Sequence, residues 1–239
     1  LSFNPVFLSG GYKSRANGPV EVNFHSNKNQ FGDEALILAK VGPTIISKNR
    51  CLGVKFIENH ECKFDVIIMD DGLQNYQVFK NIKLLTLDRK SLFGNRFCIP
   101  AGPLRQTISS CIKSIDAIVF TGNKGLKPEN FNSSNFSFNS YIHVNLGGFD
   151  FKNIKFLAFC GIANPDKFYK TLELTNINVK KKINFSDHYN YNKNDINKLI
   201  RIAKKNNLKL ITTEKDIVKI EKKFHKIIHF LPIEIKMSR

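Results

Sequence analysis

Phe64-Asp-Val-Ile-Ile-Met-Asp-Asp-Gly-Leu-Gln-Asn75 joins a short apolar run to two adjacent carboxylates and a glycine. The run is too short for a buried helix and is typical of a strand that is buried on both faces of a parallel sheet. Ligands of such sheets bind at the carboxyl ends of the strands, so we expect Asp70 and Asp71 at the mouth of a cleft. Adjacent carboxylates favour a hard cation such as Mg²⁺ together with a phosphate. The alternative interpretation is that one Asp caps the next turn and the other is solvated.

Strands alternate with helices on both sides of this segment. Apolar runs predict strands at 5–9, 44–47, 83–87, 116–120, 155–159, 209–212 and, as the last one, 227–231. Helical patterns begin near Gly32, Asn49, Asn164, Asp195 and Thr213. Two polar, Asn-rich stretches, 13–31 and 122–139, are predicted to be loops. The alternation indicates an α/β fold with largely parallel sheets, with one domain over 1–148 and a smaller α/β domain over 149–239.

The composition describes a folded and strongly basic chain. With 239 residues, of which 42% are hydrophobic, it can form one large or two small domains. The formal charge of +17 would suit nucleic acid or an anionic membrane. We attribute part of this charge to a joint excess of Lys, Asn, Ile and Phe, which is typical of AT-rich coding sequence. No aromatic–basic RNA signature accompanies the charge, so a nucleic-acid binder is the weakest interpretation.

The five cysteines are scattered and form no C-x-x-C pair, so neither a zinc ribbon nor a disulfide framework is predicted. We expect them to be reduced thiols of a cytosolic protein. The sequence contains no segment typical of a membrane span or of a signal peptide. The chain opens on Leu1 with a predicted strand close behind it, and we therefore expect that a natural N-terminal segment is missing.

Four charged residues outside the central segment stand in patterns that suit chemistry. Asp33 and Glu34 open an apolar helix, where acids also complement the helix dipole, so capping is the alternative interpretation. Arg105 follows a rigid proline-rich turn and would suit bidentate phosphate binding, with an exposed surface arginine as the alternative. His188 lies in a polar loop, where a surface histidine is the commoner case.

Six motifs occur in a fixed order along nearly the whole chain. They are Gly32-Asp-Glu-Ala35, Asp70-Asp-Gly-Leu-Gln74, Phe93-Gly-Asn95 with Pro100-Ala-Gly-Pro-Leu-Arg105, Phe159-Cys-Gly-Ile-Ala-Asn-Pro165, Asp187-His188 and Thr212-Thr-Glu-Lys-Asp216. In this order they resemble the tetraacyldisaccharide 4'-kinases, the lipid A pathway kinases of Gram-negative bacteria. A G-x-x-x-x-G-K-[ST] phosphate-binding loop does not occur in the 239 residues. The resemblance leaves the roles of Lys215 and Asp216 unassigned.

The resemblance implies a P-loop NTPase-like parallel sheet, here without its Walker A segment, and a second, smaller α/β domain. It implies an enzyme that transfers the γ-phosphate of ATP, with Mg²⁺, to the 4'-hydroxyl of a tetraacyldisaccharide 1-phosphate. The expected partners are this lipid disaccharide and the anionic inner-membrane surface, with no nucleic acid. The protein would be a monomer, peripheral to the cytoplasmic face of the inner membrane. Because the family's phosphate loop and membrane helix are not in this sequence, we expect residues 1–239 alone to be inactive.

The resemblance also implies roles for single residues. Asp70 and Asp71 match the Walker B acids and would hold Mg²⁺. Asp33 matches the proposed base that deprotonates the sugar hydroxyl, and His188 matches the histidine paired with that base, a pairing expected only when the two domains close. Arg105 would steady phosphate charge during transfer.

Two more residues, Glu34 and Gln74, are assigned to cofactor binding by the same resemblance. Three positions depart from the family's pattern. Gly10 replaces an arginine, Asn75 a common histidine, and Gln106 an acid that often follows the arginine of the turn. These departures support the alternative that the protein is a non-catalytic nucleotide- or glycolipid-binding remnant of the family.

Overall fold

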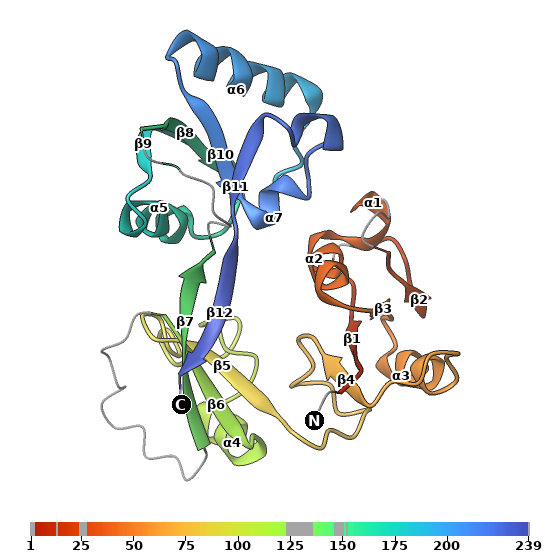
Figure 1. Cartoon of the computed structure of the whole chain (residues 1–239). Coiled ribbons are helices and arrows are strands. Elements are labelled where there is room, and N and C mark those ends of the chain that lie inside the picture. The colour runs from red at the N-terminus through yellow and green to blue at the C-terminus, as the bar shows by residue number, and fades with distance from the viewer. Residues whose placement is uncertain are drawn as a thin grey trace. The chain divides into compact units, whose positions relative to one another are not determined.

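The computed structural model describes residues 3–12, 14–23, 28–122, 136–145, 151 and 153–238. They form a mixed α/β structure with three four-stranded sheets (Figure 1). The chain divides into two compact units, the first comprising Leu1–Gly72 with Val144–Pro232 and the second Leu73–His143 with Ile233–Arg239. The α/β class and the mostly parallel strands predicted from the sequence are confirmed. The predicted domain boundary between residues 148 and 149 lies outside the described residues.

The first sheet of the first unit has the strand order β2-β3-β1-β4. Its strands are β1 (Pro5–Ser9), β2 (Val20–Glu21), β3 (Thr44–Ile46) and β4 (Val66–Met69), and its helices are α1 (Lys28–Phe31), α2 (Asp33–Val41) and α3 (Arg50–Glu58). Strands β1, β3 and β4 are parallel, so their carboxyl ends lie at one edge of the sheet. Val6 and Leu8 of β1 are fully buried in the core because β1 has a neighbour on each side.

Two predictions from local sequence are wrong in this part of the chain. The apolar composition of β4 predicts burial on both faces, but β4 is the edge strand of its sheet and Ile68 is 44% exposed. Among the described residues β4 pairs with β1 on one side, and its other side lacks a strand neighbour. The segment 13–31, predicted to be a loop, contains β2 and α1. Strand β2 forms by antiparallel pairing with β3, a tertiary contact that a polar local composition does not reveal.

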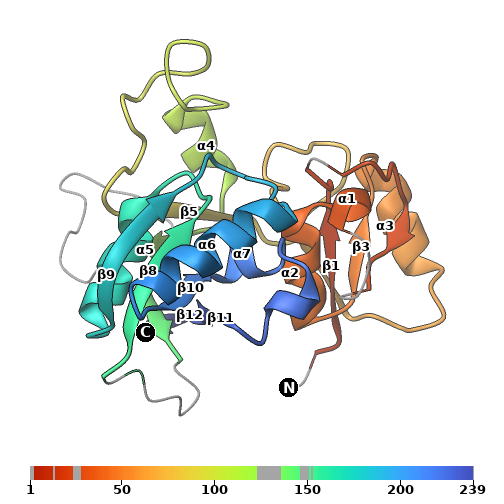
Figure 2. The same cartoon turned by 90° about the horizontal axis from the view of Figure 1, so that it is seen from above.

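The second sheet of the first unit has the order β11-β10-β8-β9, and all its pairings are parallel. Its elements are β8 (Lys155–Cys160), α5 (Pro165–Leu174), β9 (Asn178–Asn184), α6 (Lys193–Lys205), β10 (Lys209–Thr213), α7 (Glu214–Ile217), η1 (Lys222–Phe224) and β11 (Ile228–Leu231). Helices α5 and α6 cover opposite faces of this sheet (Figure 2). Accordingly, Phe156 and Ala158 of β8 pack in the core that contains Leu172 of α5, and Leu157 and Phe159 of β8 in the core with α6. The predicted helix start at Asn164-Pro165 is confirmed, because the Asn164 side chain accepts from the Lys167 amide.

The second unit contains one sheet with the order β12-β7-β6-β5 and one helix among its described residues. The elements are β5 (Leu84–Asp88), α4 (Ile108–Ser114), β6 (Ala117–Thr121), β7 (Phe136–Val144) and β12 (Ile233–Ser238). Strand β12 follows β11, so the prediction that 227–231 is the last strand is wrong. Residues 136–139, predicted as part of a loop, begin β7 because they pair with β6, and 123–135 lie outside the described residues. No helix in the described ranges is long and apolar enough to cross a bilayer.

Candidate functional site

The carboxyl ends of β1 and β4 bring together Ser9, Asp70 and Asp71. We call these three residues and Arg50 of α3 the aspartate edge. Ser9 Oγ donates to Asp70 Oδ2 at 3.1 Å, and the Asp70 amide continues the ladder to Leu8 O at 3.0 Å. Asp71 adopts a left-handed backbone conformation with φ of 48° and is exposed. The structure therefore places both acids at the sheet edge that the strand pattern predicts.

Arg50 is a member of the aspartate edge that sequence reasoning missed. It is 7% exposed, and its Nη2 donates to the Asp70 carbonyl at 2.8 Å. Burial lowers the pKa of Arg50, and the charges of Asp70 and Asp71 oppose that shift. A signal was present in the sequence, because a cation in the first turn of a helix opposes the helix dipole and needs another reason to be there.

One nitrogen of Arg50 has no hydrogen-bond partner. Of the buried side-chain nitrogens and oxygens that the structure describes, Arg50 Nη1 and Tyr191 Oη lack one. An unsatisfied buried donor is costly, and native proteins retain such groups where water, an ion or a ligand satisfies them. Gly10 provides room for this guanidinium, since a Cβ at Gly10 would lie 3.1 Å from Arg50 Nη2. The aspartate edge therefore offers both carboxylates for a cation and a free donor for an anion.

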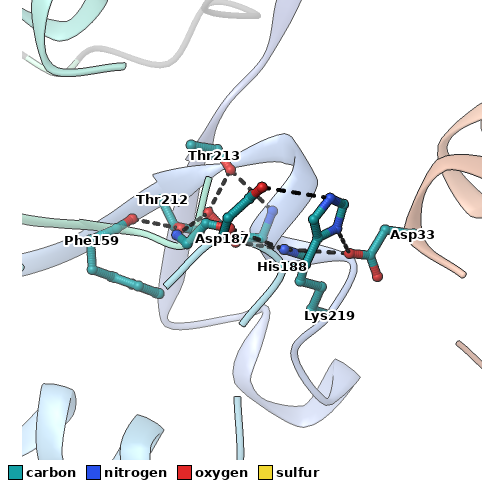
Figure 3. A network of polar contacts seen from close by, with 9 residues as sticks. Asp33, Phe159, Asp187, His188, Thr212, Thr213 and Lys219 are labelled. Carbon is teal, nitrogen blue, oxygen red and sulfur yellow. Dashed lines mark hydrogen bonds and ion pairs between the residues drawn. The ribbon is translucent and has the colours of Figure 1, made fainter. Parts of the chain in front are cut away.

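Asp33 belongs to a second group, the Asp33 cluster, in which it lies beside His188 and Lys219 (Figure 3). Asp216, which pairs with Lys219, is the fourth member. Asp33 lies in the first turn of α2, and its side chain is 11% exposed. Asp33 Oδ2 lies 3.4 Å from His188 Nδ1 and also 3.4 Å from Lys219 Nζ. Helix α2 begins after Gly32 with no side-chain cap, so the Asp33 carboxylate faces this cluster and does not cap its own helix.

His188 is held in place mainly through its backbone. Its φ is 57°, an uncommon conformation for a residue other than glycine, and its amide donates to Gly161 O at 3.1 Å. The ring packs edge-on against Tyr12 with the centroids 5.9 Å apart, and Nε2 lies 3.9 Å from Asp187 Oδ2. The loop conformation thus directs Nδ1 towards Asp33.

Sequence reasoning assigned no role to the motif Thr212–Asp216. In the structure it contributes Asp216 to the Asp33 cluster. Asp216 is fully buried and accepts from the Gly161 amide at 3.0 Å and from Thr213 Oγ1 at 2.8 Å. Burial raises the pKa of Tyr191, and the Asp216 charge raises it further. Glu214 of the same motif pairs with Lys40 of α2 at 3.3 Å, so the motif contacts the helix that carries Asp33.

The aspartate edge and the Asp33 cluster are connected by the segment 9–12. Ser9 bonds Asp70, and Tyr12 at the other end packs against His188. Three peptide steps separate Ser9 from Tyr12, so their Cα atoms are at most about 11 Å apart. Both groups belong to the first unit.

Two predicted site residues, Gln74 and Arg105, belong to the second unit. Arg105 Nη1 donates to Gln74 Oε1 at 3.4 Å, and Arg105 is exposed at the end of the turn that the prolines predict. Glu34 lies beside Asp33 in the first turn of α2. The structure thus brings together Asp33 with His188, Asp70 with Asp71, and Gln74 with Arg105.

These features define an α/β protein in which two carboxylates follow the carboxyl end of a parallel strand beside the buried Arg50. A third carboxylate, at the start of α2, lies against an imidazole and the buried Lys219. The family model of tetraacyldisaccharide-1-P 4'-kinase (LpxK) matches residues 2–239 of the chain. The chain therefore belongs to the tetraacyldisaccharide-1-P 4'-kinase family.

Similar proteins agree with this membership. The chain is 38% identical over 217 residues to the tetraacyldisaccharide 4'-kinase of Rickettsia bellii, covering 90% of this chain and 66% of that protein. It is 35% identical over 234 residues to that of Rickettsia typhi, covering 98% of this chain and 72% of that protein. The fold matches the crystal structure of the "apo" form of LpxK from Aquifex aeolicus in complex with ATP, with a TM-score of 0.79 and 24% identity, over 99% of this chain and 76% of that one. The chain thus spans about two thirds of the length of the Rickettsia bellii protein.

Proposed function

We propose that the protein containing this chain transfers the γ-phosphate of ATP to the 4'-hydroxyl of a tetraacyldisaccharide 1-phosphate in lipid A biosynthesis. The observation that carries the proposal is the contact between Asp33 and His188, which lie 155 positions apart in the sequence and meet at 3.4 Å at two motif positions of the family. The names of the relatives, the tetraacyldisaccharide 4'-kinases, support the choice of substrate.

The chemistry assigns Asp33 the role of general base. As the sugar hydroxyl oxygen attacks the γ-phosphorus, its proton moves to the free carboxylate oxygen of Asp33. A phosphorus–oxygen bond to the sugar forms, the bond between the γ-phosphorus and the bridging oxygen breaks, and ADP leaves with the bonding electrons. His188 orients the carboxylate through Oδ2. A positioned base of this kind contributes a factor of about 10²–10⁴ in rate.

The aspartate edge fits a magnesium ion bound together with phosphate. Mg²⁺ prefers hard oxygen ligands and is usually held by one or two carboxylates, with phosphate oxygens and waters completing its shell. Asp70 and Asp71 supply two such carboxylates, whereas the described residues contain no cluster of three or more protein ligands. When bound, the ion would neutralise charge that develops on the transferred phosphate. Arg50 Nη1, which is buried and lacks a hydrogen-bond partner, would donate to the same anion.

The remaining assignments are part of the same proposal. We assign Glu34 and Gln74 to nucleotide binding and Arg105 to stabilising phosphate charge. We also propose a P-loop NTPase-like domain over 1–148 with a smaller α/β domain over 149–239. The net charge of +17 supports peripheral binding to the anionic cytoplasmic face of the inner membrane. We also propose that the protein is a monomer and does not bind nucleic acid.

Replacing Asp71 by Asn is expected to raise the Mg²⁺ concentration that gives half-maximal turnover about tenfold or more, because one hard, charged ligand is lost. A magnesium titration of ATP-dependent phosphorylation measures this directly. The matched control is Asp166→Asn, which removes an acid from the first turn of α5. An unchanged magnesium requirement in the Asp71 variant would remove Asp71 from the metal site.

The function itself is tested with the product of the complete reading frame that contains these residues. Tetraacyldisaccharide 1-phosphate is incubated with ATP labelled at the γ-phosphate, and the lipid is separated and counted. Transfer of the label to the 4' position is expected. No transfer under conditions in which a characterised family kinase is active would refute the proposal.

A non-catalytic binding protein is the second candidate, and Gly10 favours it because a basic side chain of the family's pattern is lost there. The Arg50 guanidinium beside Gly10 keeps a cation at this position in space. Equilibrium binding measured together with turnover separates the two candidates. The remnant binds ATP or lipid disaccharide without converting either, whereas the kinase consumes both.

A further inference from the structure

Lys219 is a buried lysine at the centre of the Asp33 cluster. Its side chain is 2% exposed, and Nζ lies 3.4 Å from Asp33 Oδ2, 3.1 Å from Asp216 Oδ1 and 3.3 Å from Gly161 O. An ammonium group has three N–H donors, and three acceptors surround this one. Two donors serve Gly161 O and Asp216 Oδ1, the ammonium forms an ion pair with Asp33, and the side chain is closed to solvent. Lys219 therefore acts through its neighbours.

Asp216 fixes the position of this ammonium. Its Oδ2 accepts hydrogen bonds from the Gly161 amide and from Thr213 Oγ1, and its Oδ1 accepts one from Lys219 Nζ. Because Asp216 is fully buried and bonded on both oxygens, it cannot move to follow a shift of Lys219. The ammonium is thus a fixed charge, and the more exposed Asp33 side chain forms an ion pair with it.

The same backbone carbonyl locates both groups that contact Asp33. Gly161 O accepts from the His188 amide at 3.1 Å and from Lys219 Nζ at 3.3 Å. Gly161 directly follows β8, a strand with neighbours on both sides and a fully buried apolar run. The rigid end of β8 therefore sets the positions of His188 and Lys219 relative to each other.

Both contacts fall on one oxygen of Asp33. His188 Nδ1 and Lys219 Nζ approach Oδ2, and among the described residues none forms a hydrogen bond or ion pair with Oδ1 (Figure 3). A carboxylate fixed through one oxygen presents the other in a defined direction. We propose that Lys219 is a positioning residue that holds the Asp33 carboxylate with its Oδ1 turned towards the acceptor hydroxyl. This inference rests on the proposed function, in which Asp33 is the base.

A positioning role differs in its kinetics from a purely structural ion pair. Loss of a purely structural pair lowers the amount of folded protein and leaves the rate per folded molecule unchanged. Replacing a positioning residue lowers kcat without weakening substrate binding, because the residue does not touch the substrate. Its effect also disappears once the Asp33 carboxylate is gone, since two groups that act as a unit are not additive.

The experiment compares wild type, Asp33→Asn, Lys219→Met and the double variant in the complete protein, with rates normalised to folded protein. Lys219→Met is expected to lower kcat about 10²-fold, as a small misplacement of a reacting group can, and to change KM for the lipid less than about threefold. In the Asp33→Asn background the same substitution is expected to change the residual rate less than about threefold. Lys219→Arg is expected to retain kcat within about tenfold of wild type, because it keeps the charge and the donors.

Lys223→Met is the matched control, because Lys223 is an exposed lysine paired with Glu221 and is expected to leave kcat unchanged. Should Lys219→Met not fold, Lys219→Met/Asp216→Leu removes both buried charges together and is expected to show the same loss of kcat. Wild-type kcat in either folded variant would overturn the inference, as would an equal loss in the wild-type and Asp33→Asn backgrounds. Failure of the wild-type protein to phosphorylate the lipid would instead refute the proposed function.

Discussion

Replacing Asp33 by Asn is expected to lower kcat for phosphoryl transfer about 10²–10⁴-fold, the range that a positioned general base contributes. The amide retains an oxygen for Lys219 and His188 but cannot accept a proton from the sugar hydroxyl. Substrate binding is therefore expected to change little, and the loss should fall on kcat and on kcat/KM alike. Steady-state kinetics with the complete protein, varying the lipid at saturating ATP, measure both constants.

A suitable control for this variant is Glu173→Gln, which neutralises an exposed acid of α5 that pairs with Lys182 at 3.2 Å. The control should keep the wild-type kcat. Thermal unfolding of Asp33→Asn should remain within a few degrees of wild type, which separates lost chemistry from lost structure. A kcat within about threefold of wild type in the folded Asp33→Asn variant would exclude Asp33 as the base, because even a weak general base contributes more than that.

Replacing Asp216 by Ala is expected to have the largest effect on stability, about 3–5 kcal/mol of unfolding free energy, because it leaves the buried Lys219 without its closest counterion. The change also removes the acceptor of the Gly161 amide and of Thr213 Oγ1. Stability is measured by denaturant unfolding monitored by circular dichroism, with the slope compared between variants to check that the transition remains cooperative.

Asp195→Ala provides the comparison for that variant. Asp195 is the third residue of α6 and forms a capping box with Asn192 at the helix start. Losing a cap costs about 0.5–2 kcal/mol, so the Asp216 variant should be clearly the less stable of the two. If Asp216→Ala lost no more stability than Asp195→Ala, the buried network around Gly161 would contribute far less than its geometry indicates.

The class of fold could be read from the sequence because β1, β3, β4, β8 and β10 are short apolar runs that end near glycine, aspartate, serine or threonine. The same pattern placed Asp70 at a sheet edge, since parallel strands align their carboxyl ends. Motif spacing singled out Asp33 and His188 although local sequence alone favoured a helix cap and a surface histidine. Their contact depends on how distant segments pack, which a periodicity does not encode.

The errors have a common physical origin. β4 has the composition of an interior strand, but composition does not report how many neighbours a strand has, and the structure places β4 at an edge. Strands β2, β7 and β12 were missed because their side chains are largely exposed, so they lack the apolar run on which strand prediction relies. Arg50 and Lys219 were missed because a charged residue is ordinarily a surface residue. Lys219 is buried because three separate segments contribute the oxygens that compensate its charge, an arrangement that local sequence does not reveal.

The first unit is discontinuous in the chain, since Leu1–Gly72 and Val144–Pro232 form it together while the intervening residues form another. Ribosomes extend a chain from its N-terminus, so Asp33 emerges long before Lys219 and Asp216 are synthesised. A nascent or prematurely terminated chain therefore carries the carboxylate without the ammonium that orients it. Translation beyond Lys219 is thus a prerequisite for assembling the Asp33 cluster, and on the proposed function fragments released before that point should be without phosphotransfer chemistry.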